Sequence, residues 1–272
     1  MFFAPMLLQK TNEPFDDDSY ITELKLDGIR LILSKFDNKV KLYTRHNNEV
    51  TALFKEIYEN LNIPDGTVLD GELIVPGTDG APNFEAVMER FKSKKSQHFL
   101  QYCVFDIIYF NGKNIAAKPL IERKEILSSL DFDQERIVTV QWTEGHGVPY
   151  FNIVKKRDLE GIVLKRKDSQ YEINKRTDKW LKVINYKYKD VLITGILKKD
   201  QSFLLSPLDS NQNIGVMEFV PTKERKQIYR EIEQTGITEN EKAIYFKQGI
   251  PCNVKFRNWT SKGKLRIPSF NA

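Results

Sequence analysis

The chain has 272 residues, of which 40% are hydrophobic, so it can bury the core of one large domain or of two. Its 42 basic and 37 acidic residues leave a net charge of only +5, so total charge alone gives no argument for nucleic-acid binding. The apolar start MFFAPMLLQK is short, lacks a basic beginning and contains Pro5, and it predicts neither a signal peptide nor a membrane anchor. Cys103 and Cys252 lack the neighbours of a metal site or redox pair, so we expect buried free thiols in a cytoplasmic protein.

The first two thirds of the chain contain both strand and helix patterns. From residue 20 to about 75 the pattern is mostly extended, with one helix expected near 53–61. Then follow a helix over 82–95, a buried strand over 101–110, a helix over 119–130, and strands at VTVQW (138–142) and DLEGIVLKR (158–166).

The composition changes near NYKYKD (185–190), which predicts a boundary between a first domain, 1–186, and a second, 190–272. The second part shows three strands, a helix at about 223–234 and two further strands. That order is typical of a five-stranded oligonucleotide-binding (OB) barrel. A small α+β domain of another kind is the alternative.

The segment ELKLDGIR (23–30) has two interpretations. Asp27-Gly28 between alternating runs is a strong hairpin signal, which would make Lys25 and Arg30 solvated charges. Alternatively, a lysine stripped of water or set beside another cation can attack as a neutral amine. The eight residues alone do not choose between the two.

Five further segments follow in order: Thr44-Arg45, LDGEL (69–73), FDIIYFNG (105–112), EGIVLK (160–165) and WLKV (180–183). Together with KLDGIR (25–30) they resemble the motifs of the covalent nucleotidyltransferases, and the final arginine of KLDGIR is most similar to the ATP-dependent DNA ligases. The resemblance implies an α+β fold, in which an ATP-grasp-like nucleotidyltransferase domain of antiparallel sheets with helices precedes a small OB-fold β-barrel.

This resemblance implies an enzyme that seals nicked duplex DNA, in replication, repair or recombination, with ATP and Mg²⁺ (or Mn²⁺) as cofactors. Only 24 residues precede Lys25, which favours ATP because NAD-dependent ligases carry an extra domain there. The expected enzyme is a minimal ligase of the bacterial or phage type, a monomer that does not bind membranes.

The resemblance also assigns roles to single residues. Lys25 would be the nucleophile that becomes linked to AMP. Glu23 would contact the adenine amino group, Phe105 would stack on the base, Arg30 and Glu72 would bind the ribose side, and Lys165 and Lys182 would face the α-phosphate. Glu160 would hold Mg²⁺, Arg45 would grip the 5′-phosphate of a nick, and Arg266 would orient the departing pyrophosphate.

Each residue taken singly also has a structural interpretation. Glu72 after Asp70-Gly71 fits an exposed charge beyond a second hairpin turn, Phe105 fits a core aromatic, and Glu160 fits a loop charge. Asp106 is different, because a carboxylate within an apolar run needs a partner.

Two departures from the family pattern concern the phosphates. Ile184 stands where the resembled enzymes have a second lysine, and TSKGKLRIPSF (260–270) matches only the beginning of their last motif, so Arg266 can equally be a surface charge. The rival functions are an RNA ligase or a guanylyltransferase of mRNA capping, and a non-catalytic OB-containing protein that binds nucleic acid.

Overall fold

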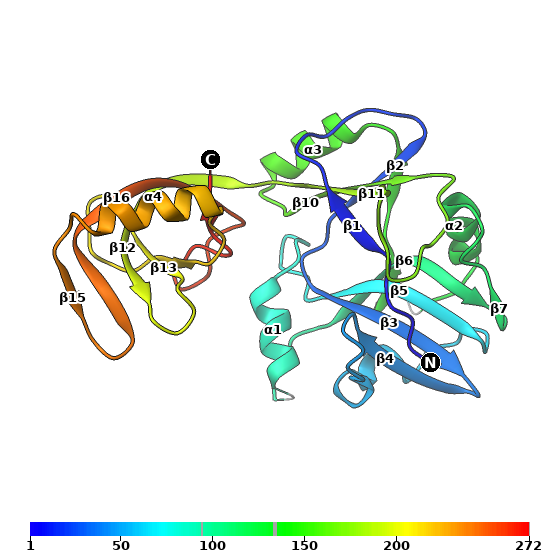
Figure 1. Ribbon diagram of the computed structural model, residues 1–272. Helices are drawn as coiled ribbons and strands as arrows, with labels where there is room; N and C mark the ends of the chain where they lie inside the picture. Colours follow the sequence, from blue (N-terminus) through cyan, green and yellow to red (C-terminus); the bar gives the residue numbers. More distant parts are fainter. Residues whose placement is uncertain (94, 133–134, 272) are drawn as a thin grey trace. The chain divides into compact units, whose positions relative to one another are not determined.

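The structure is a computed structural model that describes residues 1–93, 95–132 and 135–271. The chain divides into two compact units, Met1–Ile184 and Asn185–Ala272. Unit 1 contains two sheets, which we call A and B, and unit 2 contains a third (Figure 1). None of the helices formed by the described residues has the length and apolar character needed to span a bilayer.

Sheet A has the strand order β1-β11-β10-β2-β9. Its strands are β1 (Leu7–Lys10), β2 (Tyr20–Leu24), β9 (Trp142–Glu144), β10 (Gly161–Arg166) and β11 (Arg176–Ile184). Neighbouring strands are antiparallel, except for the parallel pair of β1 and β11.

Sheet B has the strand order β4-β3-β5-β6-β7, and β8 pairs with β6 in parallel. Its strands are β3 (Ile29–Phe36), β4 (Lys39–Thr44), β5 (Thr67–Ile74), β6 (Gln101–Phe110), β7 (Lys113–Asn114) and β8 (Ile137–Thr139). Asn111 and Gly112 both have positive φ, which suits the tight turn between β6 and β7.

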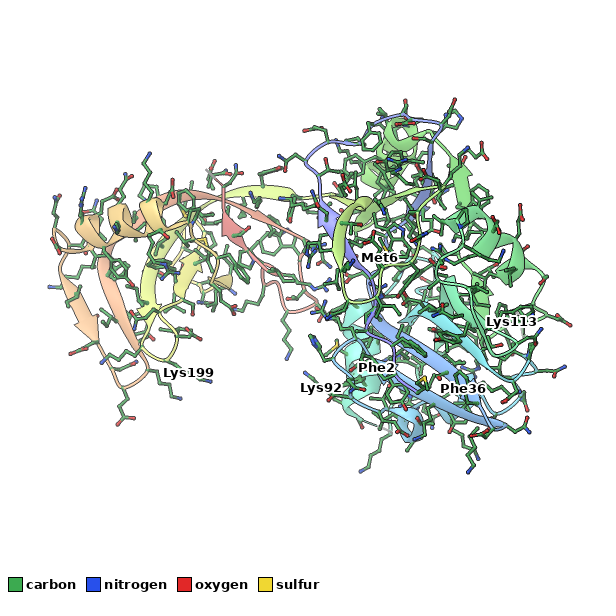
Figure 2. The ribbon with its side chains drawn as sticks, turned by 45° about the vertical axis from the view of Figure 1, so that its right-hand side comes forward. Phe2, Met6, Phe36, Lys92, Lys113 and Lys199 are labelled. Atoms are coloured by element: carbon green, nitrogen blue, oxygen red, sulfur yellow. The ribbon has the colours of Figure 1, made fainter. Side chains whose placement is uncertain are left out.

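The two sheets share one apolar layer. Sheet A contributes Ile21 and Trp180 to it, and sheet B contributes Ile32, Val68 and Ile108. The N-terminal segment covers part of this layer: Met6 is fully buried in it, and Phe2, like Phe36 of β3, packs against it (Figure 2).

Helices complete unit 1. The opposite face of sheet B packs against α1 (Phe84–Lys92), which begins after Asn83, whose side chain accepts a hydrogen bond from the backbone of Ala86 at 3.0 Å. The opposite face of sheet A packs against α3 (Gly147–Lys156), and α2 (Leu120–Ser128) lies beside β6. The helices expected over 82–95 and 119–130 are confirmed, and α3 was not expected.

One helix and one strand predicted for unit 1 differ from the structure. The helix expected near 53–61 is replaced by two 3-10 turns, Thr51–Leu53 and Lys55–Ile57, because Phe54 between them leaves the helical conformation and is fully buried under sheet B. The single strand expected at 138–142 is split between β8 in sheet B and β9 in sheet A.

Unit 2 has one sheet with the order β14-β13-β12-β16-β15, and β17 pairs with β16. Its elements are β12 (Lys187–Leu197), β13 (Phe203–Ser206), β14 (Gly215–Met217), α4 (Thr222–Ile232), β15 (Ile237–Glu239), β16 (Ala243–Phe256) and β17 (Ser269–Phe270). The order of three strands and a helix is as expected, but three strands follow the helix instead of two, because the short strand β15 was not predicted.

The expected closed barrel is absent from the part of unit 2 that the structure describes. An isolated bridge joins Phe219 to Ser269, but no continuous ladder closes the sheet. The strands that would close it, β14, β15 and β17, are only two or three residues long, too short for a continuous ladder.

Candidate active site

The segment ELKLDGIR carries the chain from sheet A to sheet B. β2 ends at Leu24 and β3 begins at Ile29 in the other sheet, so the hairpin interpretation of Asp27-Gly28 is wrong. A side chain at Gly28 would clash with the carbonyl oxygen of Leu73, so glycine is needed for a close approach between backbones rather than for a hairpin turn. The charges of this segment therefore lie where the two sheets meet.

The register of sheet A places several predicted site residues on one face, because directly opposite residues and every second residue of a strand project to the same side. Three rows share that face: Trp180–Lys165–Ile21, Lys182–Val163–Glu23 and Ile184–Gly161–Lys25. Ile21 and Trp180 belong to the shared apolar layer, so this face is turned toward sheet B. Ile184, which stands where the resembled enzymes have a second lysine, therefore lies in the same row as Lys25.

We call Lys25, Arg30, Asp70, Glu72 and Glu160 the nucleophile cluster. The Nζ atom of Lys25 donates to Oε2 of Glu160 at 2.8 Å, and the two side chains are 19% and 10% exposed. Arg30 donates from Nε and Nη2 to the two carboxylate oxygens of Asp70, at 2.9 and 2.5 Å. Burial disfavours the Arg30 cation, but the Asp70 carboxylate outweighs it and raises the pKa of Arg30.

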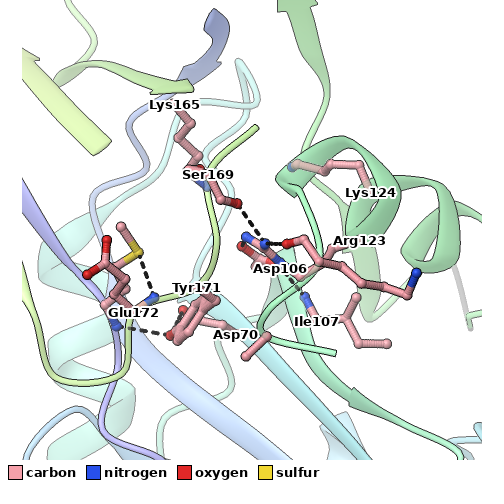
Figure 3. A network of polar contacts seen from close by, with 12 residues as sticks. Asp70, Asp106, Ile107, Arg123, Lys124, Lys165, Ser169, Tyr171 and Glu172 are labelled. Atoms are coloured by element: carbon pink, nitrogen blue, oxygen red, sulfur yellow. Dashed lines mark hydrogen bonds and ion pairs between the residues drawn. The ribbon is translucent and has the colours of Figure 1, made fainter. Parts of the chain in front are cut away.

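Asp70 is fully buried and has a second donor. The hydroxyl of Tyr171 donates to Oδ2 of Asp70 at 2.6 Å and accepts a hydrogen bond from the backbone of Met6 at 3.1 Å (Figure 3). Arg30 is therefore held by a carboxylate that is itself fixed from the side of the core.

The segment LDGEL is not a turn, because it runs through the middle of β5. Alternation along the strand puts Asp70 and Glu72 on the same face, and a side chain at Gly71 would clash with the ring of Tyr102. Glu72 is partly buried, so its interpretation as an exposed charge beyond a hairpin is wrong.

Burial is the main cause that raises the pKa of Glu72 to about 7. The Lys25 and Arg30 cations oppose this effect only in part, and the Glu160 and Asp70 carboxylates reinforce it. A carboxyl group that titrates near neutral pH beside a lysine is a feature more common at functional sites than elsewhere.

A β-bulge aims Phe105 into the shared layer. Asp106 pairs with Asp70 and Val104 pairs with Gly71, which leaves Phe105 as the extra residue of β6. Bulges of this kind redirect side chains next to active sites, and here Phe105 contacts the layer between the sheets instead of the core under sheet B.

Asp106 has the partner that its place in an apolar run requires. Arg123 of α2 donates from Nε and Nη2 to its two carboxylate oxygens, both at 2.8 Å, and neither side chain is exposed (Figure 3). Arg123 also donates to the carbonyl oxygens of Lys118 and Ser169. Burial opposes ionisation of Asp106, but the pairing with Arg123 outweighs it and lowers the pKa of Asp106.

We call Glu23, Phe105, Lys124, Lys165 and Trp180 the Glu23 cluster. Glu23 is 2% exposed; Lys124 of α2 donates to its Oε1 atom, and the Nζ atom of Lys165 lies 2.7 Å from Oε2. The same Nζ atom is 4.4 Å from the ring centroid of Phe105 and 4.2 Å from the ring of Trp180.

Burial lowers the pKa of Lys165 to about 8; the Glu23 carboxylate opposes this effect and the Lys124 ammonium reinforces it. Lys165 thus contacts both residues predicted for the adenine base, Glu23 and Phe105, in addition to Trp180.

The other predicted residues take different positions. Lys182 is partly buried in β11, in the row of Glu23. Arg45 is exposed just beyond β4, where its Nε donates to His46 at 2.9 Å. Arg266 belongs to unit 2 and is partly buried, and it precedes β17 rather than lying on it.

Sequence reasoning missed Asp70, Lys124 and Trp180 as members of the two clusters, and it did not identify Arg123 as the partner of Asp106. The sequence did predict the helix that carries Arg123 and Lys124. That both side chains are buried is known only from the structure.

Cys103 is buried and Cys252 is partly buried, and neither forms a disulfide, as expected. Burial raises the pKa of each thiol to about 12.

Residues 5–183 match the family model of the ATP-dependent DNA ligase domain. The chain is 58% identical over 272 residues to the SPbeta prophage-derived DNA ligase-like protein LigB of Bacillus subtilis, covering all of this chain and 99% of that protein. It is 27% identical to the multifunctional non-homologous end joining DNA repair protein LigD of Mycobacterium tuberculosis, covering 98% of this chain but only 38% of LigD.

Solved structures agree on the fold. A Lig E DNA ligase, described as binding DNA with a minimal scaffold, superposes with a TM-score of 0.70 at 20% identity over 100% of this chain and 99% of that one. The ligase domain of M. tuberculosis LigD superposes with a TM-score of 0.62 at 22% identity over 99% and 94%. With a family model that spans most of its length, the chain belongs to the ATP-dependent DNA ligase family.

Proposed function

We propose that this enzyme seals nicks in duplex DNA through a lysine-AMP intermediate. The observation that supports this most directly is the position of Lys25: it lies at the crossover between the two sheets, paired with Glu160 at 2.8 Å and beside the partly buried Glu72. Its place one strand row from Glu23, the residue proposed for the base, would bring Lys25 next to a bound nucleotide.

The proposed reaction has three transfers. The Lys25 ammonium first loses a proton to solvent, and the neutral Nζ attacks the α-phosphorus of ATP. A P–N bond forms, the bond to pyrophosphate breaks, and Nζ releases a second proton to solvent. The 5′-phosphate of the nick then attacks the same phosphorus, which releases the lysine. Finally, the 3′-hydroxyl attacks the 5′-phosphate, loses its proton and displaces AMP.

The two clusters divide the nucleotide between them. The Glu23 cluster is assigned to the base, with Glu23 accepting from the adenine amino group and Phe105 stacking on the ring, a contact worth about 1–3 kcal/mol. The resemblance places Lys165 at the α-phosphate, but we propose it for this half instead because it contacts both residues. Arg30 and Glu72 are assigned to the ribose, and Lys182 to the α-phosphate.

Glu160 fits a Mg²⁺ ligand, because Mg²⁺ binds through one or two carboxylates and keeps several waters. No group of three or more His, Cys, Asp or Glu side chains among the described residues forms a dedicated cage, which agrees with a cation that arrives with the triphosphate. When bound, Mg²⁺ would neutralise charge on the phosphates.

Unit 1 is assigned as the nucleotidyltransferase domain and unit 2 as the OB domain. Arg45 is exposed and is proposed to hold the 5′-phosphate at the nick. Arg266 of unit 2 is proposed to act on pyrophosphate. We place the activity in the cytoplasm, in a monomer; the unpaired thiols agree with a reducing compartment.

Enzyme-AMP formation tests the proposal. The full chain is incubated with Mg²⁺ and α-labelled ATP or GTP, and one part of each reaction is resolved on a denaturing gel. The other part is first given nicked DNA or nicked RNA and is then resolved in the same way. We expect label from ATP only, transfer to nicked DNA, and complete loss of label in Lys25→Ala. Lys39→Ala, an exposed lysine of β4, is the matched control and should behave as the wild type. Undiminished labelling of Lys25→Ala would contradict the assignment of the nucleophile.

A further inference from the structure

Helix α2 reaches the site from outside the motifs that identify the family. We propose that Lys124 is a positioning residue that fixes the Glu23 carboxylate to accept the adenine amino group, so that selection of ATP depends on α2. This inference rests on the proposed function, because it requires Glu23 to contact the base.

The contact between Lys124 and Glu23 is buried and directional. Lys124 is 6% exposed, Glu23 is 2% exposed, and the Lys124 ammonium donates a hydrogen bond to Oε1 of Glu23. Lys165 reaches Oε2 at 2.7 Å, but its Nζ finds no partner of hydrogen-bond geometry within the described part of the chain. Of the two lysines, Lys124 therefore makes the directional hydrogen bond that orients the carboxylate.

The position of α2 is itself fixed beside the other base residue. Arg123 donates two hydrogen bonds to Asp106 (Figure 3). Asp106 directly follows Phe105 in the β-bulge of β6. Consecutive helical residues are separated by about 100° around the axis. Arg123 therefore reaches β6 of sheet B while Lys124 reaches β2 of sheet A. One turn of α2 thus ties together the two residues assigned to the base, Glu23 and Phe105.

The difference between adenine and guanine explains why an oriented Glu23 carboxylate would select ATP over GTP. A carboxylate has about four acceptor sites, and the two lysines engage one oxygen each, which leaves sites for an N–H group. Adenine presents an amino donor where guanine presents a carbonyl acceptor. An oriented, ionised Glu23 attracts the first and repels the second. Tyr150 of α3 is a further titratable group that interacts with the Glu23 carboxylate: burial, reinforced by that charge, raises the pKa of Tyr150.

The test compares ATP with purine riboside triphosphate, which lacks the amino group. Enzyme-AMP or enzyme-analogue formation is measured over a range of nucleotide concentrations for the wild type, Lys124→Met, Lys124→Arg and Lys118→Met. Lys118 is the matched control, because it is 45% exposed and pairs with Glu122 on the surface.

We expect the wild type to prefer ATP and Lys124→Met to lose about tenfold of that preference, mainly through a higher KM for ATP, with the analogue little affected. Lys124→Arg should restore most of the preference, and Lys118→Met should keep all of it. In Lys124→Met, Glu23 remains paired with Lys165, and the charges of that pair cancel. We therefore expect the melting temperature of Lys124→Met to be close to that of Lys118→Met.

The outcomes separate this inference from the proposed function. A wild type that forms no adduct with ATP overturns both. A wild type that prefers ATP, with the preference unchanged in Lys124→Met, overturns only the inference. Equal loss on both nucleotides, or a melting temperature far below that of Lys118→Met, shows a structural role and overturns it too.

Discussion

Replacement of Glu72 by glutamine should stabilise the protein at alkaline pH while it impairs function. Burial raises the pKa of Glu72 to about 7 from its ordinary 4.5, so ionised Glu72 costs the folded state about 3 kcal/mol at pH 8. The sign follows from linkage: between these two pKa values the folded state binds more protons than the unfolded chain, so stability falls as pH rises. At pH 5 the cost is only about 1 kcal/mol.

Glutamine resembles the protonated carboxyl group and removes this cost. For a unit of this size, Glu72→Gln should raise the melting temperature by about 6–12 °C at pH 8 and by about 2–4 °C at pH 5. Tryptophan fluorescence can follow the transition, because Trp180 of unit 1 is 1% exposed. Glu59→Gln, an exposed carboxylate that is 47% accessible, is the control and should change little at either pH.

If Glu72→Gln did not raise the melting temperature at pH 8, or raised it equally at both pH values, the reasoning about burial would be refuted. Enzyme-AMP formation by Glu72→Gln should fall at least about tenfold if Glu72 binds the ribose. A variant that is more stable and fully active would leave the functional assignment of Glu72 without support.

The remaining predictions concern three cations. Arg123→Ala leaves Asp106 buried without its partner and should destabilise unit 1 by about 3–5 kcal/mol in denaturant unfolding; a loss no larger than that of Lys118→Ala would contradict this. Because burial lowers the pKa of Lys165 to about 8 from 10.5, the unfolded chain binds more protons between these values, so wild-type stability should rise across that interval and Lys165→Met should show no such rise. Arg266→Ala should slow sealing of a plain nick with ATP at least about tenfold while sparing a nick already carrying AMP, and equal losses on both would point to DNA binding or folding.

The sequence predicted those parts of the fold that depend on local pattern. The apolar run of β6, the helical spacing of α1 and the strand that contains β10 were each predicted, because strand and helix patterns are properties of neighbouring residues. Alternation also explains why Glu23 and Lys25 share a face with Lys165 and Lys182 once the register is known.

Contacts between distant segments could not be predicted in the same way. Asp27-Gly28 and Asp70-Gly71 carry the same hairpin signal, yet the first joins two sheets and the second lies within a strand. In both cases glycine is required by a neighbour far away in the sequence, Leu73 in one case and Tyr102 in the other. The bulge at Phe105 likewise depends on the register with β5, which is not encoded in the run itself.

The charges of the two clusters indicate what the site must receive from outside. The nucleophile cluster holds two cations and three carboxylates, whereas the Glu23 cluster holds one carboxylate and two ammonium groups. Burial relieves both imbalances in the same way, because it favours the protonated form of Glu72 and the neutral form of Lys165. The nucleophile cluster then becomes neutral but not positive, although a triphosphate brings several negative charges and its departing pyrophosphate concentrates them. Additional cations are therefore required in the first step, and a divalent ion, Lys182 and Arg266 of unit 2 are the candidates. Because the DNA steps release no pyrophosphate, the need for Arg266 should end with the first step.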